Sequence, residues 1–335
     1  MRIKHGGGEQ ADIDFSVNLN PLGISNEVRK AAAEADFERY PDTECTELRS
    51  AISEYEKIDA KQIVCGNGAA DMIYRIVGAV KPKRALIIEP TFAEYEKALL
   101  EANCNVEKHF LLECDEFALK RDFFEKINKA VDIVFICNPN NPTGTSTEHV
   151  GEIVRRCAET NTLLVVDECF MDFTENAECY SAKLVLNKNT MIVKAFTKSF
   201  SMAGLRLGYA ICGNIALAEK ISEYGQPWSV SAAAQAAGIA ALKIHDYLDR
   251  SRELIKHERD FLSNELTALG IKVFPSETNF LLLKSVYPLK EMLMQKHILI
   301  RSCDNFEGLG KEFFRISVKT HKENTALINA LKELI

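Results

Sequence analysis

The sequence predicts an α/β protein in which a large domain with a mainly parallel central sheet is followed by a smaller α+β domain. Two observations lead to this fold class. Between about residues 60 and 215, short apolar runs rich in β-branched residues alternate with longer amphipathic stretches. After Pro227 this alternation ends, and a long helical stretch precedes three short strand-like runs and a last helix.

In the large domain, the apolar runs predict strands at residues 85–89, 131–137, 162–166, 190–193 and 207–212. The amphipathic stretches predict helices at residues 70–80, 93–102, 148–159 and 215–224. Apolar strands separated by helices are typical of a parallel sheet with both faces covered. Ligands of such sheets bind where the strands end, so polar residues directly after each run are candidate site residues.

The C-terminal part predicts a long helical stretch at roughly residues 231–269, strands at 278–283, 298–301 and 313–318, and a closing helix from about residue 322. In the first 24 residues, glycine, asparagine and proline predict turns, so we expect an arm there rather than a domain. The expected units are the arm (1–24), a large domain (25–226) and a small domain (227–335).

Charge and composition exclude several classes of protein. The chain has 335 residues, with 41 Lys and Arg against 48 Asp and Glu, and a net charge of -7. An acidic chain without a Lys/Arg-rich run is not expected to bind nucleic acid, which requires cations at the phosphates. The apolar runs are far shorter than the roughly 20 residues that span a bilayer, and the N-terminus lacks the apolar core of a signal peptide. We therefore expect a cytoplasmic protein with no membrane partner.

The cysteines point to the same compartment. All ten are at least ten residues apart, so the CxxC spacing of zinc and redox sites is missing. We expect reduced, mostly buried thiols and no metal.

One lysine stands in a segment of unusual composition. Residues 194–209 read KAFTKSFSMAGLRLGY and place Lys198 among small or apolar neighbours. A lysine in such a pocket can have a lowered pKa and form a Schiff base with an aldehyde. Taken alone, Lys198 is better explained as a surface lysine whose stem covers apolar groups, and the other segments decide against that interpretation.

Two further segments each follow an apolar run. Residues 165–173, VVDECFMDF, place Asp167 and Glu168 at a strand end, where a carboxylate can keep a ring nitrogen protonated or simply cap a loop. Residues 137–144, CNPNNPTG, hold Asn141 in a loop made rigid by prolines. From there its amide can reach a ligand oxygen or serve turn geometry only.

A fourth segment follows a strand-like run and opens a helix. Residues 65–71 read CGNGAAD, and small residues there let backbone N–H groups of the helix N-terminus approach a phosphate. An ordinary strand-to-helix turn has the same composition. The spacing is not GxGxxG, because Asp71 takes the third glycine position, so an NAD-dependent oxidoreductase is only a distant alternative.

In this order, the four segments resemble the pyridoxal-phosphate (PLP) enzymes of fold type I, the aspartate-aminotransferase superfamily, over nearly the whole chain. The resemblance implies PLP as cofactor, with Lys198 as its covalent attachment, Asp167 beside the pyridine nitrogen and Asn141 at the ring oxygen O3′. It also implies a homodimer with shared active sites. The other implied cofactor contacts are Gly68, Ala69 and Ala70 at the helix N-terminus, Phe92 on the ring face, Thr197 and Arg206 at the phosphate, and Tyr40 of the partner subunit.

Two subfamilies share these segments. NPNNPTG, AGLRLGY and ERYPD are also typical of histidinol-phosphate aminotransferase. HGG at 5–7, DFSVNLNPLG at 14–23, FAEY at 92–95, QPWSVSA at 226–232 and ILIRSCDNFEGL at 298–309 resemble L-threonine-O-3-phosphate decarboxylase of cobalamin biosynthesis more closely. The resemblance thus implies decarboxylation of L-threonine O-3-phosphate to (R)-1-aminopropan-2-yl phosphate. Histidinol-phosphate aminotransferase or another class I/II amino acid aminotransferase is the alternative.

The same resemblance implies which residues surround a phosphorylated amino acid. They are His5, Gly6, Asn18, Asn141, Arg301 and Arg315, so the arm would contribute to the active site. Arginine suits both anions of O-phosphothreonine, because it donates paired hydrogen bonds to carboxylate and phosphate. The residues leave open which arginine binds which anion, and each could instead point outward from its strand.

Three residues depart from the family pattern. Phe170 stands where aminotransferases have a tyrosine that bonds O3′, Ala195 where a Ser or Thr bonds the phosphate, and Lys194 where arginine is usual. One phosphate hydrogen bond is therefore in question, and Thr197 is a candidate to supply it. We expect Lys198 or a nearby hydroxyl such as that of Tyr209 to return a proton to Cα.

Overall fold

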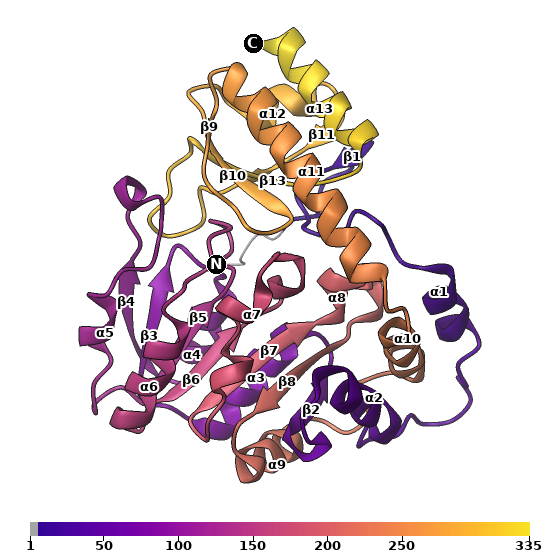
Figure 1. Cartoon of the computed structure of the whole chain (residues 1–335), viewed down its shortest axis with the longest axis vertical. Coiled ribbons are helices and arrows are strands. Elements are labelled where there is room, and N and C mark those ends of the chain that lie inside the picture. Colours follow the sequence, from indigo (N-terminus) through magenta and orange to yellow (C-terminus); the bar gives the residue numbers. More distant parts are fainter. Residues whose placement is uncertain (1–5) are drawn as a thin grey trace.

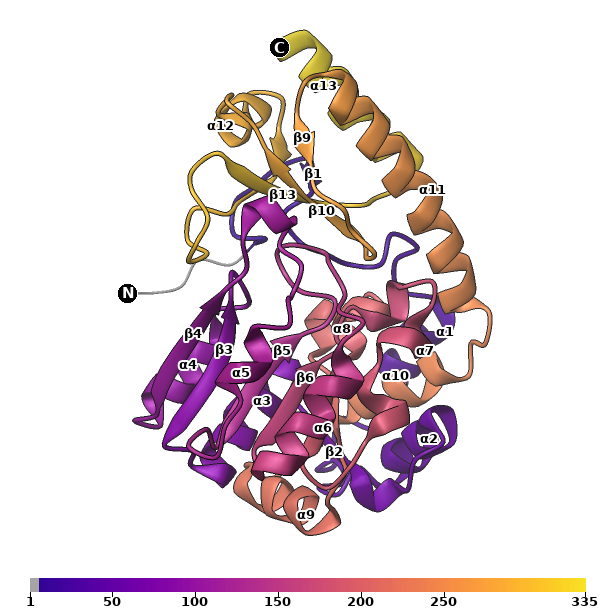
Figure 2. The ribbon, with the colours of Figure 1, turned by 60° about the vertical axis from the view of Figure 1, so that its left-hand side comes forward.

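The structure of the chain is a computed structural model that describes residues 6–335. Its elements form a large α/β body and a smaller body above it, and the long helix α11 (Tyr247–Ala268) runs along the side of the smaller body down to the larger one (Figures 1 and 2). Across the described range, no helix combines the length and the apolar character that crossing a membrane requires.

A seven-stranded sheet forms the centre of the large body, in the order β2-β8-β7-β6-β5-β3-β4. Its strands are β2 (Ile63–Gly66), β3 (Arg84–Glu89), β4 (Asn105–Phe110), β5 (Ile133–Cys137), β6 (Leu163–Asp167), β7 (Thr190–Ala195) and β8 (Gly208–Cys212). Neighbouring strands are parallel except that β8 runs antiparallel to both β2 and β7. The prediction of a mainly parallel sheet is confirmed. The edge strand β4 was not predicted, because its residues NVEKHF are mostly polar.

Helices cover both faces of this sheet. The predicted ones are present as α3 (Ala69–Val80), α4 (Glu94–Glu101), α6 (Val150–Thr160) and α9 (Ile215–Tyr224). Shorter helices are α5 (Phe123–Lys126), α7 (Ala177–Tyr180) and α8 (Phe196–Ser199). Because side chains alternate along a strand, Leu86 and Ile88 of β3 belong to one hydrophobic core and Ala85 and Ile87 to the other.

The long helical stretch expected at roughly residues 231–269 is present as two helices, α10 (Ala232–Leu242) and α11, and the break between them was not predicted. Their sequences show the reason. α10 reads AAAQAAGIAAL and packs on α1 (Asn26–Ala33) and α2 (Thr46–Glu56) of the large body. α11 is amphipathic and continues to the small body, so the chain bends between them at residues 243–246.

The small body contains a four-stranded antiparallel sheet in the order β12-β13-β10-β9. Its strands are β9 (Lys272–Val273), β10 (Phe280–Lys284), β12 (Arg301–Ser302) and β13 (Phe313–Ser317), and its helices are α12 (Leu289–Met294) and α13 (His321–Leu334). The strand predicted at 298–301 is therefore split between β11 (Ile298–Leu299) and β12.

The N-terminal arm is built into the small body. Strand β1 (Ile13–Asp14) pairs in parallel with β11, and Phe15 is fully buried in the core of the small body. The chain then turns down toward the large body along residues 16–24. The expected unit boundaries at residues 24 and 226 stay predictions.

Candidate active site

A cavity of about 490 Å³ lies where β5, β6 and β7 end and the small body faces them. Of the 15 residues that the sequence singled out, 12 line it: Gly6, Asn18, Ala69, Ala70, Phe92, Asn141, Asp167, Thr197, Lys198, Arg206, Arg301 and Arg315. Their elements are far apart in the chain, from the arm to β13. Phe170 and Ala195, two of the departures from the family pattern, line the cavity as well.

Lys198 lies on α8, the short helix that directly follows β7. Burial lowers the pKa of its amine to about 8, and the nearby Arg315 guanidinium acts in the same direction. The amine nitrogen is 5.9 Å from the centre of the Phe170 ring. A buried amine with a lowered pKa is a nucleophile near neutral pH.

Asp167, the last residue of β6, is held by two hydrogen bonds. Tyr95 donates its hydroxyl to Oδ2 at 2.6 Å, and the Cys169 amide donates to Oδ1 at 3.0 Å. Burial, followed by the Asp167 charge, raises the pKa of Tyr95 well above its usual value, so Tyr95 stays a donor. The sequence analysis did not assign Tyr95 to the site. Its place three residues after Phe92, in the first turn of the predicted helix at 93–102, was the available signal.

The N-terminus of α3 forms a concave backbone surface. Its N-cap is Gly68, with φ +84°, and no side chain caps the helix. A Cβ at Gly68 would lie 2.8 Å from Arg206 Nη2, and one at Gly208 would lie 2.5 Å from the Ala69 nitrogen. Only glycine fits both positions, and the Ala69 and Ala70 N–H groups are left as donors for an anion.

Arg315 on β13 is buried above Lys198. It donates to Asn141 Oδ1, and through Nη2 to the Ser16 carbonyl at 2.8 Å. Burial lowers its pKa to about 10. Within residues 6–335, its Nε and the Oδ1 of Asn18 are buried without a hydrogen-bond partner. Two polar atoms of cavity-lining residues are therefore open to a ligand.

Arg301 is the cross-strand neighbour of Arg315, because β12 and β13 pair these two residues directly. It donates to Asn305 Oδ1 at 2.5 Å, and its guanidinium lies 5.6 Å from the Phe306 ring centre. Arg301 and Phe306 both line the cavity, so the segment after β12 forms one of its walls.

Three residues of the prediction are not in the cavity wall. His5 lies outside the described residues. Gly68 lies against the Arg206 guanidinium, where a Cβ would come within 2.8 Å of Nη2. Tyr40 is 79% exposed and stacks on Trp228, with ring centres 4.5 Å apart.

Lys194 and Tyr209 point away from the cavity. They are cross-strand neighbours on β7 and β8, and both contact the buried Glu56: Lys194 Nζ at 2.8 Å and the Tyr209 hydroxyl at 2.5 Å from Oε1. The expectation that Tyr209 returns a proton to Cα is therefore wrong. Since successive strand residues face opposite sides, Ala195 in the cavity already requires Lys194 to face the other way.

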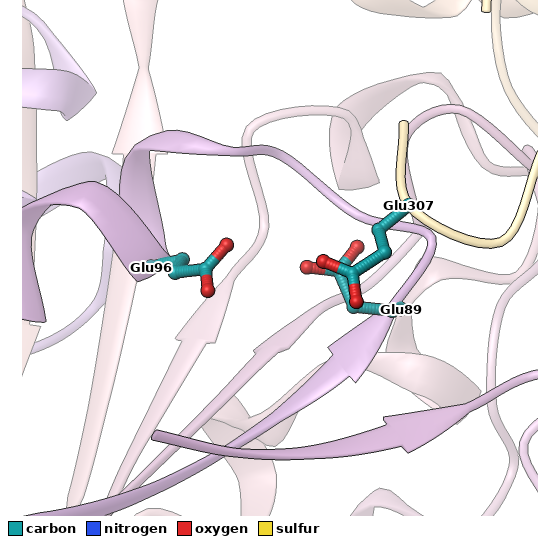
Figure 3. Close-up of side chains that lie close together, drawn as sticks. All are labelled: Glu89, Glu96 and Glu307. Atoms are coloured by element: carbon teal, nitrogen blue, oxygen red, sulfur yellow. The ribbon is translucent and has the colours of Figure 1, made fainter. Parts of the chain in front are cut away.

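A cluster of carboxylates lies near the mouth of the cavity. Figure 3 shows Glu89 and Glu307 close together, with Glu96 facing them across a gap. The Lys108 ammonium lies 2.6 Å from Glu96 Oε1 and also pairs with Glu307. Glu307 directly follows Phe306, so this ion pair connects the cavity wall to strand β4 of the large sheet.

The match to a family model extends over residues 10–331, and the model describes class I and II aminotransferases. The chain belongs to this family. The expected aspartate-aminotransferase-like fold is confirmed, because an aspartate aminotransferase structure from Thermus thermophilus, 20% identical, superposes with a TM-score of 0.85 over 96% of both chains. The dinucleotide-dependent alternative has no support from this assignment.

Among the relatives are members of both predicted subfamilies. The threonine-phosphate decarboxylase of Salmonella typhimurium is 32% identical over 96% of this chain and 91% of its own length. The structure of a histidinol-phosphate aminotransferase from Clostridium acetobutylicum is 32% identical, with a TM-score of 0.88 over 96% of this chain and 98% of that one. The structure of an L-threonine-O-3-phosphate decarboxylase from Porphyromonas gingivalis is 25% identical, with a TM-score of 0.81 over the same shares.

Proposed function

We propose that this chain is a PLP-dependent decarboxylase that converts L-threonine O-3-phosphate to (R)-1-aminopropan-2-yl phosphate. The observation that carries the proposal is one cavity that holds a buried amine, Lys198, and two guanidinium groups, Arg301 and Arg315. Such a cavity suits an amino acid with a second anionic group. The relative from Salmonella typhimurium named threonine-phosphate decarboxylase supports the same substrate.

The described residues fit PLP. The uncapped α3 N-terminus and Arg206 would hold its phosphate, Asp167 its ring nitrogen, and Lys198 its aldehyde carbon. Phe92 and Phe170 offer apolar surface for the ring. When bound, PLP supplies an electron sink for the electrons of a bond broken at Cα.

We assign the substrate carboxylate to Arg315 and the phosphate to Arg301. In the substrate, the carboxylate shares a carbon with the reacting amine, whereas the phosphate is attached through Cβ and an oxygen. Arg315 is close enough to Lys198 to lower its pKa, so it lies near the reacting amine. Arg301 lies one strand further out, on the edge strand β12.

The placement of the carboxylate decides the reaction type. Of the bonds at the substrate Cα, only the one perpendicular to the plane of the PLP ring would break readily. Its electrons would then overlap with the π electrons of the ring. Arg315 and Asn141 favour CO2 loss if they hold the carboxylate perpendicular to this plane, and amino transfer if they hold it in the plane. Lys198 is the donor that we propose for the proton returned to Cα, since Tyr209 is bonded to Glu56.

A paired assay tests the reaction. The purified chain, loaded with PLP, is given L-threonine O-3-phosphate, and CO2 release is measured; in parallel it is given glutamate with imidazole-acetol phosphate, and oxoglutarate is measured. We expect CO2. Oxoglutarate without CO2 would contradict the proposal and support histidinol-phosphate aminotransferase, which the 32% identical structure favours as second candidate.

Two substitutions test the assignment of the arginines. Arg301→Gln is expected to lower kcat/KM for the phosphorylated substrate about 100-fold, with little effect on any activity toward unphosphorylated L-threonine. Arg315→Gln is expected to lower both. Equal losses for the two variants on both substrates would contradict the assignment.

We also propose that the chain acts as a homodimer in the cytoplasm, with Tyr40 reaching the phosphate site of the partner subunit. The aromatic side chains of Phe37, Tyr40 and Trp228 are 69%, 79% and 47% exposed, and exposed aromatic groups close together are typical of interfaces. Eight of the ten free thiols are buried, which suits a reducing compartment. Sedimentation of the wild type and of Tyr40→Ala, with PLP retention as second readout, tests the dimer.

A further inference from the structure

A chain of polar contacts runs behind Lys198, on the side away from the cavity. Ser199 donates its hydroxyl to Asp172 Oδ2 at 2.6 Å. The other oxygen of Asp172 lies 2.9 Å from Lys194 Nζ, and this ammonium lies 2.8 Å from Glu56 Oε1. None of these four residues lines the cavity.

The helix that carries Lys198 needs such support. α8 has four residues and no capping side chain, and a single helical turn is not stable by itself. Its position therefore depends on tertiary contacts. Asn20 holds the backbone, because its side-chain amide donates to the Ser199 carbonyl at 2.7 Å and its N–H to the Lys198 carbonyl at 3.3 Å. The bond to Asp172 is a polar contact to a side chain of α8.

Asp172 is close in sequence to Phe170, which lines the cavity, but does not line it itself. It lies in the 3-10 helix η3 (Met171–Phe173), which directly follows Phe170 and lies five residues after Asp167. The Ser199–Asp172 bond thus connects the segment with Phe170 to the helix with Lys198. Adjacent helical residues project about 100° apart, so a fixed Ser199 also fixes the direction of Lys198.

Charge keeps Asp172 in place. Glu56 accepts hydrogen bonds from Lys194, from Lys183 at 2.8 Å and from Tyr209, so its carboxylate is a fixed anchor for Lys194. Desolvation opposes the charge on Lys194, but Asp172 and Glu56 outweigh it and raise its pKa well above the usual value. Arg252 of α11 donates to the Asp172 carbonyl at 3.0 Å and holds the backbone at this point.

We propose that Asp172 is a positioning residue for Lys198: through Ser199 it holds α8 so that the Lys198 amine points into the cavity, while Lys194 and Glu56 hold Asp172. The inference rests on the proposed role of Lys198 as the attachment point. It assigns a function to Lys194, which stands where the family usually has arginine and makes no contact in the cavity.

The test uses the full chain without added PLP and measures the exposure of the Lys198 amine directly. Lys198 is methylated with formaldehyde and cyanoborohydride over a range of pH, and the rate is followed by mass spectrometry of its peptide. Ser199→Ala removes the donor, Ser199→Thr restores a hydroxyl, and Asp172→Asn removes the charge. Ser181→Ala is the matched control, because Ser181 donates to another buried carboxylate, Glu168 Oε2, at 2.8 Å without touching α8.

We expect the midpoint of the wild-type titration near the pKa of about 8 given by burial. In Ser199→Ala it should rise by about one pH unit, because the released amine becomes more solvated. Asp172→Asn should shift it in the same direction, and Ser199→Thr and Ser181→Ala should not. If Asp172→Asn fails to fold, Ser199→Ala decides.

The proposal would be overturned if Ser199→Ala left the Lys198 titration unchanged and lost only as much thermal stability as Ser181→Ala. The Ser199–Asp172 bond would then contribute to stability alone. This outcome is separate from the test of the function. The titration uses neither PLP nor substrate, so a failed CO2 assay would leave it standing, and CO2 release would not rescue it.

Discussion

Two clusters in this molecule place a lysine between carboxylates. They differ in burial and in the ratio of positive to negative side chains. Behind the cavity, Lys194 and Lys183 face Glu56 and Asp172, two cations for two anions, and the Glu56 side chain is 1% exposed. At the mouth, Lys108 pairs with Glu96 and Glu307, with Glu89 beside them; among residues 6–335 no second cation is paired with these three carboxylates, and Glu307 is 51% exposed. The first place suits a fixed anchor, and the second suits a contact that can be exchanged for water.

The physical reason is the cost of an unpaired charge. A buried ion contributes little net stability as a pair, but removing its partner is expensive because the remaining charge cannot reach water. At an exposed site, water and salt replace the lost partner. The same residue types therefore form a buried network in one region and connect the cavity wall to strand β4 in the other.

The strongest challenge to this comparison is Lys194→Met. It leaves Glu56 and Asp172 short of a cation in a buried region, so we expect a loss of about 3–5 kcal/mol in the free energy of unfolding by urea titration. Lys183→Met is the matched control, since Lys183 also bonds Glu56 but its side chain is 36% exposed. Equal losses in both variants would mean that burial does not decide the effect.

Glu56→Gln removes the anchoring charge. Although burial opposes ionisation, Lys194 and Lys183 lower the pKa of Glu56 to about 2 from 4.5, so its stabilisation is present above pH 4.5 and is lost as pH falls toward 2. We expect a loss on the order of 3 kcal/mol at pH 7. The gap to the wild type should narrow by about 2 kcal/mol between pH 6 and pH 3. A gap that is constant over this range would contradict the assigned pKa.

Glu89→Gln probes the cluster of Glu89, Glu96 and Glu307. Unlike Glu56→Gln, it is expected to raise the free energy of unfolding. Burial raises the pKa of Glu89 from 4.5 to about 7, so folding loses stability as pH rises between these values. The glutamine variant should be more stable than the wild type by about 3 kcal/mol at pH 8, and within about 0.5 kcal/mol of it at pH 4.5. Thermal unfolding at the two pH values measures this difference, and no gain at pH 8 would show that Glu89 ionises without cost.

The smallest effect on stability is expected from Lys108→Met, below about 1 kcal/mol, because the pair with Glu307 is accessible to water. Its effect should fall on substrate binding, since Glu307 follows Phe306 in the cavity wall. We expect KM to rise about three-fold with kcat unchanged. Lys332→Met is the control: Lys332 bonds Glu265 at 2.6 Å on the outer side of the small body and should leave KM unaltered.

Local sequence signals predicted most of the site. Asp167 ends an apolar strand, Asn141 follows another, and Lys198 comes directly after a third, so their places at one edge of the sheet follow from the strand pattern. Tyr95, Ser16 and the chain from Glu56 to Ser199 were missed. Their roles depend on contacts between residues 22 to 299 positions apart in the sequence, which no local pattern encodes.

The errors have the same origin. The polar edge strand β4 is formed only because β3 is there to pair with it. The division of residues 231–269 into two helices reflects two different packing partners, the large body for α10 and the small body for α11. Tyr209 was expected at the cavity because it lies near Lys198 in sequence, yet strand β8 turns it toward Glu56.

The sequence by itself determined the fold class and the family, and it singled out Lys198, Asp167, Arg301 and Arg315 as candidates. Periodicity and short motifs carry this information locally. Only the tertiary structure decided which side of the sheet each polar residue faces, and that Lys194 contacts Glu56 and Asp172 rather than lining the cavity. A buried charged side chain points toward the oppositely charged group that it can pair with. Such groups come from distant segments of the chain, so they meet only when these segments pack.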